Sequence, residues 1–308
     1  MREFNIDYNK TFKGVLIAYL AIFVIGAVMA CVFGINLDIN FSGGTKISYS
    51  YTDEIKNEDI EATVKEQIKN DFTLTKSTSL AGDTQTFEIS LIGKNALSAE
   101  NQEKLTSALS EKFKDNNIAL YNSNSVSPTI AGSFFLKSLV AVLITAVLVV
   151  IYVGFRFRKI GGISAALTAF CALIFDILIT FFTCAIFRLQ IDSNYMAVVL
   201  TILGYSLNDT IVIYDRIREN ERLFPDLEIG ELVNKSVNKV MIRNIVTTVT
   251  TILAVVTIIV VAEFFGLTTL RTFAIPMAFG LISGSISSIF ISGPLWVIWK
   301  RYKAKKAK

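Results

Sequence analysis

The sequence predicts an α-helical membrane protein whose six spanning helices carry one small α+β domain outside the bilayer. Apolar residues make up 52% of the 308-residue chain and charged residues only 18%, against roughly 25% charged in an average soluble protein. One long polar stretch, 38–130, follows the first of six apolar runs, which gives a 1+5 layout. Each run is long enough to cross a bilayer; they cover 14–33, 133–154, 162–187, 194–214, 243–262 and 271–299.

Composition divides the chain into four parts. We assign 1–36 to the N-terminus and first helix, 37–132 to the external domain, 133–299 to a five-helix bundle, and 300–308 to a basic tail. The first run is longer than the apolar core of a usual signal peptide, so we expect it to span the membrane rather than to be cleaved. The polar segment 215–241 is interpreted as a short amphipathic linker helix.

The polar stretch 38–130 alternates between strand and helix patterns. Ile47, Tyr49 and Tyr51 occupy every second position, which indicates a strand, whereas Ile60 and Val64 share one helix face. Similar patterns predict further strands near 72–74, 87–91 and 118–120, and a second helix over 105–113. The resulting order, strand, helix, strand, strand, helix, strand, is that of a ferredoxin-like unit.

The distribution of basic residues predicts the orientation in the membrane. Lys and Arg gather in the N-terminus, in 155–161, in 215–241 and in the tail, while the opposite loops carry little beyond Arg188 and Arg271. Basic loops stay on the cytoplasmic side, so both termini are expected inside and 38–130 outside. Because these charges adjoin apolar runs, the net charge of +4 indicates a lipid surface rather than a nucleic acid.

Asp209 is an acidic residue inside the fourth apolar run. It lies six residues before Asp215, which places it about 10 Å along the helix from the basic residues at the membrane surface. A carboxylate there costs about 2.5–3.5 kcal/mol on an insertion scale, and such residues usually face a bundle interior. Tyr205 and Asn208 share its face and form a predicted polar stripe. The alternative is an interfacial acid that reaches out to the surface.

Two further charged residues belong to this hypothesis. Arg243 opens the fifth run, and Thr247 and Thr251 follow at helical spacing, so we expect this stripe to face the one that carries Asp209. The alternative is that Arg243 is only a basic residue that flanks the membrane span on its cytoplasmic side. Asp176 lies near the middle of the third run, where it either titrates or makes a packing hydrogen bond to a Ser or Thr of a neighbouring helix. Asp209, Arg243 and Asp176 are the candidates for a proton relay with an ion pair.

Other chemistry is limited by composition. The chain has no His, and its three Cys lie in apolar runs, so we predict no His-based catalytic triad, no metal site and no structural disulfide. The sequence predicts no enzyme and no cofactor, with protons as the coupling ion. Gly43 and Gly44 lie where the first helix meets the external domain, and they allow either a hinge or a tight turn.

The segments 204–210 (GYSLNDT) and 215–220 (DRIREN) resemble the fourth transmembrane helix of the SecF family, accessory subunits of the bacterial Sec translocase and members of the resistance-nodulation-division (RND) superfamily. The resemblance covers nearly the whole chain. It implies a heterodimer with SecD, association with the SecYEG channel, and YajC as a further candidate partner. It also implies that the proton motive force is used to promote export of preproteins across the bacterial cytoplasmic membrane. The family's intramembrane Asp and Arg match Asp209 and Arg243.

Two positions depart from the family pattern. Asn40 stands where the family has Asp in its Gly-Ile-Asp-Phe-x-Gly-Gly motif, here 38–44 (DINFSGG), and Phe175 stands where the third helix often has His. Three alternatives remain at this point. They are one half of an RND-type lipid or small-molecule exporter, an intramembrane aspartyl protease that uses Asp176 and Asp209, and a purely structural assembly subunit.

Overall fold

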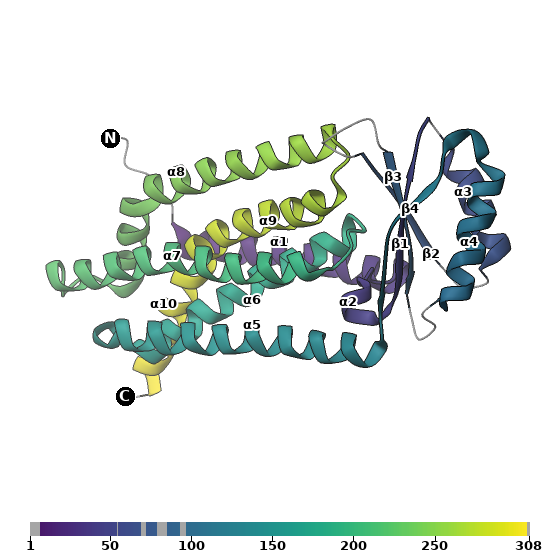
Figure 1. Ribbon diagram of the computed structural model, residues 1–308. Coiled ribbons are helices and arrows are strands. Elements are labelled where there is room, and N and C mark those ends of the chain that lie inside the picture. Colours follow the sequence, from purple (N-terminus) through teal and green to yellow (C-terminus); the bar gives the residue numbers. More distant parts are fainter. Residues whose placement is uncertain (1–6, 54, 69–71, 79–84, 93–96, 307–308) are drawn as a thin grey trace.

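The computed structural model describes residues 7–53, 55–68, 72–78, 85–92 and 97–306. A helical bundle carries a four-stranded sheet across one end, and a pair of helices covers the far side of that sheet (Figure 1). The elements before the bundle's second long helix are α1 (Tyr8–Phe33), α2 (Ile39–Ser42), β1 (Gly44–Tyr51), α3 (Asn57–Gln67), β2 (Phe72–Thr78), β3 (Gln85–Ile92), α4 (Ala99–Lys112), η1 (Lys114–Asn116) and β4 (Ala119–Val126). Those that follow are α5 (Pro128–Arg156), η2 (Arg158–Ile160), α6 (Gly162–Ile186), α7 (Ser193–Leu223), α8 (Ile229–Phe264), α9 (Thr268–Ser287), η3 (Ser288–Ser292) and α10 (Gly293–Lys306).

In the described part of the chain, six helices are long and apolar enough to cross a membrane. They are α1, α5, α6, α7, α8 and the continuous helix formed by α9, the π-helical turn η3 and α10. This agrees with the predicted class of a multi-pass helical membrane protein. The start of α1 and the end of α10 lie at the end of the bundle opposite the sheet (Figure 1).

Several helix bounds differ from the sequence expectation. The separate linker helix predicted over 215–241 is wrong, because α7 continues to Leu223 and α8 already begins at Ile229. Pro225 lies in the short connection, where it ends the helical pattern. At the other end of the bundle, α5 begins at Pro128, five residues before the expected run, and the Ser127 side chain accepts a hydrogen bond from the backbone N–H of Ile130. A capping Ser before a helix-starting Pro is a local signal that hydropathy does not report.

The sheet has the strand order β2-β3-β1-β4, and every neighbouring pair is antiparallel. Its apolar face is covered by α3 and α4 (Figure 1). Tyr49 and Phe87 stack across β1 and β3 with ring centroids 5.2 Å apart, and Ile60 of α3 and Leu105 of α4 are fully buried against this face. The alternating pattern therefore gives the domain a core of its own.

The opposite face of the sheet is polar and lies toward the bundle (Figure 1). Lys46 of β1 pairs with Ser90 of β3 and Asn124 of β4 in the strand register, and Ser48 pairs with Glu88. Because successive side chains on a strand point to opposite faces, these residues lie away from α3 and α4.

The bundle has buried and exposed helices. In the most apolar 18-residue segment of α6, half of the residues are buried. In the corresponding segments of α5 and α8, only 6% and 17% of the residues are buried. The contacts among α6, α7 and α9 therefore form the interior. α5 and α8 present apolar side chains outward, as expected of helices that meet lipid or another membrane protein.

Candidate functional site

Asp176 lies at the centre of the bundle, on α6, with no exposed surface. Three serine hydroxyls donate to its carboxyl group: Ser206 to Oδ2 at 2.7 Å, Ser283 to Oδ1 at 2.6 Å and Ser287 to Oδ2 at 2.9 Å. Ser206 comes from α7, and the other two come from successive turns of α9. A buried polar group is stable only when its hydrogen bonds are made, and here both oxygens are occupied.

A close approach between α7 and α9 brings these hydroxyls together. Gly284 lies opposite Ser206, and a Cβ added at Gly284 would lie 2.9 Å from the Cβ of Ser206. Glycine is therefore required for the two helices to approach this closely. Ser283 and Ser287 flank Gly284 and, being four residues apart, share one helix face toward Asp176.

A tyrosine from the first helix joins this network. The Tyr19 hydroxyl lies 3.0 Å from both the backbone oxygen and the Oγ of Ser283, and its side chain is 5% exposed. The ring packs edge-on against Phe175, with centroids 5.3 Å apart. Phe175 stands beside Asp176 in the sequence, so this position supplies an aromatic contact to α1 and no titrating group.

The buried polar row continues along α7 toward the end of the bundle opposite the sheet. Thr210 bonds to Ser288 at 2.9 Å, and the hydroxyl of Tyr214 bonds to Ser292 at 2.8 Å and to Thr168 at 2.7 Å. All of these side chains are buried. This row was not predicted from the sequence, although Ser288 and Ser292 repeat the four-residue spacing of Ser283 and Ser287.

The second buried acid of the bundle is Asp209, which lies on α7 with 2% of its surface exposed. Its Oδ2 atom has no hydrogen-bond partner among the described residues. Three other buried polar atoms also lack a hydrogen-bond partner among the described residues. They are Tyr205 Oη on α7 and, on α8, Asn244 Nδ2 and Thr248 Oγ1. Since unpaired buried polar atoms are uncommon, this part of α7 and α8 differs from the fully bonded surroundings of Asp176.

Arg243 does not form an ion pair with Asp209 within the described residues, although the guanidinium acts electrostatically on that carboxyl group. The arginine is exposed at the start of α8's apolar run. The structure therefore places the two predicted partners on neighbouring helices but leaves them separated.

The two predicted polar stripes are rotated relative to the bundle interior. On α7, Tyr205 is half-buried and Asn208 is exposed, while Asp209 is buried. On α8, the hydroxyls of Thr247 and Thr251 donate to the backbone oxygens of Arg243 and Thr247, one turn earlier on their own helix. In this part of α8 the buried polar residues are instead Asn244 and Thr248, one position further along.

Asp176 and Asp209 are not hydrogen-bonded to each other in the described structure, and serines occupy both oxygens of Asp176. An aspartyl protease needs two carboxyl groups that share a proton at close range, which this arrangement does not provide. Ser206 contacts Asp176 and precedes Asp209 by one helical turn, so α7 connects the two sites.

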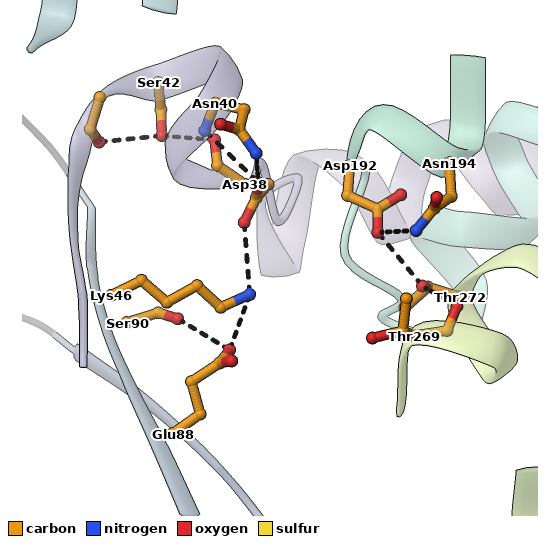
Figure 2. Close-up of polar contacts among 11 residues, drawn as sticks. Asp38, Asn40, Ser42, Lys46, Glu88, Ser90, Asp192, Asn194, Thr269 and Thr272 are labelled. Carbon is orange, nitrogen blue, oxygen red and sulfur yellow. Dashed lines mark hydrogen bonds and ion pairs between the residues drawn. The ribbon is translucent and has the colours of Figure 1, made fainter. Parts of the chain in front are cut away.

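A third polar cluster joins the sheet to the bundle (Figure 2). Asp38 caps α2 and accepts a hydrogen bond from the Asn40 side chain at 2.6 Å. Lys46 Nζ lies 3.7 Å from Asp38 and 2.8 Å from Glu88. Burial lowers the pKa of Lys46, but the hydrogen bond to Glu88 and the carboxylates of Glu88, Asp38 and Asp192 outweigh this, so the pKa is raised above its ordinary value. Asn40 thus supports the charge of Asp38 without carrying one.

Gly43 and Gly44 connect α2 to β1 with positive φ angles of 78° and 141°. A Cβ at Gly43 would lie 2.8 Å from Cα of Pro128, and one at Gly44 would overlap the backbone oxygen of Leu91. Backbone conformation and close packing therefore account for both glycines, and a hinge at this point stays a prediction. In the described residues, no group of three or more His, Cys, Asp or Glu side chains is arranged to hold a metal ion.

Comparison with known proteins gives consistent matches. Residues 105–302 match the family model described as protein export membrane protein SecD/SecF, C-terminal. The chain is 34% identical to the protein translocase subunit SecF of Alicyclobacillus acidocaldarius, over 93% of this chain and 90% of that protein. It is 32% identical to the protein translocase subunit SecDF of Bacillus subtilis, over 97% of this chain but 39% of that longer protein. A crystal structure of SecDF from Thermus, described as a translocon-associated membrane protein, matches with a TM-score of 0.80 and 28% identity, over 97% of this chain and 39% of that one.

Proposed function

Because the chain belongs to the SecD/SecF family of protein-export membrane proteins, we propose that it pairs with a SecD-like protein and uses the proton motive force to promote export through the SecYEG channel. The chain is a SecF-like subunit of Sec protein export, a transport component rather than an enzyme. The comparisons do not favour an exporter half or a protease. YajC and the translocating preprotein are further proposed partners, and the proposed location is the bacterial cytoplasmic membrane.

We propose a 1+5 topology with both termini in the cytoplasm and a ferredoxin-like domain outside. The strand order β2-β3-β1-β4 with two helices on one face supports the domain assignment. Arg156 ends α5, and Arg158 and Lys159 follow it, at the end of the bundle away from the sheet, where α7 also carries its arginines. The concentration of basic residues at that end supports its assignment to the cytoplasmic side.

The proposed partnership with SecD accounts for surfaces that the single chain leaves open. The relatives include a longer SecDF protein, which this chain covers only in part. α5 and α8 present exposed apolar side chains such as Leu143, Leu148 and Val246. A second membrane bundle would cover part of this surface and would complete the polar interior between α7 and α8.

The observation that carries the proton hypothesis is the incompletely bonded environment of Asp209. A buried carboxyl group with a free oxygen can accept a proton from water that enters the bundle. When it loses that proton, the nearby Arg243 guanidinium can approach and stabilise the charge. The two states favour different positions of α7 and α8. Moving one charge through 100 mV is worth about 2.3 kcal/mol, which is enough to bias such an equilibrium in each cycle.

Asp176 has a different proposed role in this scheme. Its three serine donors hold it in one position, and Ser206 links it to the turn of α7 that precedes Asp209. A shift of α7 against α9 would change these hydrogen bonds. Asp176 would therefore respond to the state of Asp209, either as a second proton site or as a fixed bonding centre.

The test is the export of a reporter protein in membrane vesicles that contain the channel and the SecD-like partner, with and without an imposed proton gradient. Asp209→Asn keeps size and hydrogen bonding but fixes a neutral group, so we expect the response to the gradient to be lost while ATP-driven translocation remains. Arg243→Lys should weaken the response, because an ammonium lacks the planar fork that pairs with a carboxylate. Asp226→Asn, the same chemical change at an exposed position between α7 and α8, is the matched control. An Asp209→Asn variant with a normal gradient response would show that Asp209 is structural.

A further inference from the structure

A cleft of about 630 Å³ lies between α7 and α8, near the end of the bundle opposite the sheet. Its α7 wall includes Ile211, Asp215, Glu219 and Arg222, which recur every three or four residues and so share one helix face. Arg243 belongs to the α8 wall. The cleft is a separate feature from the buried polar row around Asp176.

The charges that line the cleft leave a positive surplus of two, because four arginines face two carboxylates. Both carboxylates are already engaged: Asp215 pairs with Arg156 and Arg218, and Glu219 pairs with Arg216. The other two lining arginines, Arg222 and Arg243, form no ion pair with any described residue.

Arg216 gives a second observation at the same place. Its side chain is only 15% exposed, and its Nε atom is buried without a hydrogen-bond partner in the described structure. A buried guanidinium N–H without an acceptor is costly, and an anion in the cleft would supply that acceptor. Phosphate and carboxylate both match the guanidinium fork, and phosphate is the group that every phospholipid of a surrounding bilayer carries.

The cleft is also amphipathic along the direction of the helices. Ile211, Val212 and Val240 line it together with the arginines. On α8 the chain continues from Arg243 into apolar residues whose side chains are exposed, including Ile245 at 37% and Val246 at 54%. A molecule that placed its phosphate among the arginines would therefore have an apolar surface beside it on the side of the bilayer.

We propose that this cleft binds the headgroup phosphate of an anionic phospholipid, with the acyl chains lying along the exposed apolar face of α8. A free phosphate or a nucleotide would gain nothing from the apolar wall, whereas a membrane lipid reaches the cleft from the side. Arg222 and Arg243 would hold the phosphate, and Arg216 would donate through Nε. Binding here would couple the position of Arg243 to lipid composition.

The test is native mass spectrometry of the full-length chain co-purified with its SecD-like partner, in detergent that contains equal amounts of phosphatidylglycerol and phosphatidylcholine. We expect phosphatidylglycerol to bind about tenfold more tightly, the value of one charge-assisted contact. Arg222→Gln should remove most of this preference, and Arg222→Lys, which keeps the charge, should retain part of it. Arg243→Gln provides the same test from α8 if the first variant does not fold.

Lys239→Gln is the matched control, because Lys239 is an exposed cation of α8 that does not line the cleft. It should leave the lipid preference unchanged. The proposal would be overturned if the two lipids bound equally well. It would also be overturned if Arg222→Gln and Lys239→Gln reduced the preference for phosphatidylglycerol equally. Displacement of phosphatidylglycerol by millimolar inorganic phosphate would assign the cleft to a soluble anion. If the co-purified complex bound no lipid at all, the cleft would instead be assigned to contact with the partner protein. These readouts do not depend on export activity, so they are independent of the proton hypothesis.

Discussion

The hydroxyl of Ser283 on α9 donates to the carboxyl group of Asp176 on α6 at 2.6 Å, and the same serine receives the hydroxyl of Tyr19 from α1. One short side chain thus connects three membrane-spanning helices. Its position between Asp176 and Tyr19 means that removing this hydroxyl breaks contacts to two other helices at once.

Ser283→Ala should therefore destabilise the bundle. The substitution leaves Asp176 Oδ1 without its donor, and an unsatisfied buried polar group costs about 1–3 kcal/mol. Thermal unfolding of the detergent-solubilised chain measures the change. Thr201→Ala is the control, because among the described residues the exposed Thr201 hydroxyl bonds only to the Ala197 backbone oxygen of its own helix. Equal effects of the two substitutions would contradict the proposed importance of the Asp176 network.

Gly284→Ala should destabilise the protein by forcing α7 and α9 apart. The added Cβ would lie 2.9 Å from the Cβ of Ser206, and inserted methyl groups in packed interiors cost about 1–3 kcal/mol. Gly204→Ala on α7 is the matched control, since no atom lies within 4 Å of its added Cβ. A helix-interior Gly→Ala change in open space is expected to stabilise by up to about 1 kcal/mol. The prediction fails if unfolding midpoints of the two variants shift in the same direction by the same amount.

The proposed orientation can be tested by thiol labelling in a background without the three native cysteines. A cysteine at the exposed Glu103 of α4 should react with an impermeant reagent added outside the cell membrane. A cysteine at Asp226, between α7 and α8, should react only after the membrane is opened. Labelling of Asp226→Cys in intact membranes would reverse the topology.

Lys46 should make the junction between sheet and bundle sensitive to alkaline pH. Its pKa is raised in the folded protein by Glu88, Asp38 and Asp192 against the opposing effect of burial. A raised pKa means that the stabilisation is present below the ordinary value of 10.5 and is lost as pH rises through the higher folded value. We expect Lys46→Met to cost about 1 kcal/mol at pH 8, and to cost less at pH 11.

Unfolding of wild type and Lys46→Met at the two pH values measures this difference. Lys104→Met, which removes an exposed partner of Glu100 on α4, is the control for general effects of losing a lysine. A cost of Lys46→Met that stays constant from pH 8 to pH 11 would argue that Lys46 contributes by packing rather than by charge.

The sequence is sufficient to locate the membrane-spanning helices, but not to predict which face of each helix is buried. A bilayer requires about 20 apolar residues per span, so the six spans are visible in composition alone. Within a span nearly every residue is apolar, and the pattern no longer reports which face is buried. On α8 the difference between Thr247 and Thr248 is one residue, which is a rotation of about 100°. That rotation is set by packing against α9, and the α8 sequence alone does not record it.

The candidate residues show the same limit. Asp176 and Asp209 could be found because acids are rare within spans, and both are buried. Their surroundings could not be found, because Ser206 and Ser283 are distant in sequence and their small side chains also suit plain helix packing. Both carboxyl oxygens of Asp176 accept hydrogen bonds, whereas Oδ2 of Asp209 has no partner among the described residues. This difference depends on the tertiary structure.

The strand register has a mechanical consequence. Gly44 and Val126, the first residue of β1 and the last residue of β4, are paired with each other. Both covalent connections between the sheet and the bundle therefore leave from one point, along adjacent strands. A pull that moves the sheet domain away from the bundle loads these two strands together in the same direction, so the hydrogen bonds between them are neither sheared nor unzipped. β2 and β3 have no such tether, and a force applied to them passes sideways through the sheet as shear before it reaches the membrane.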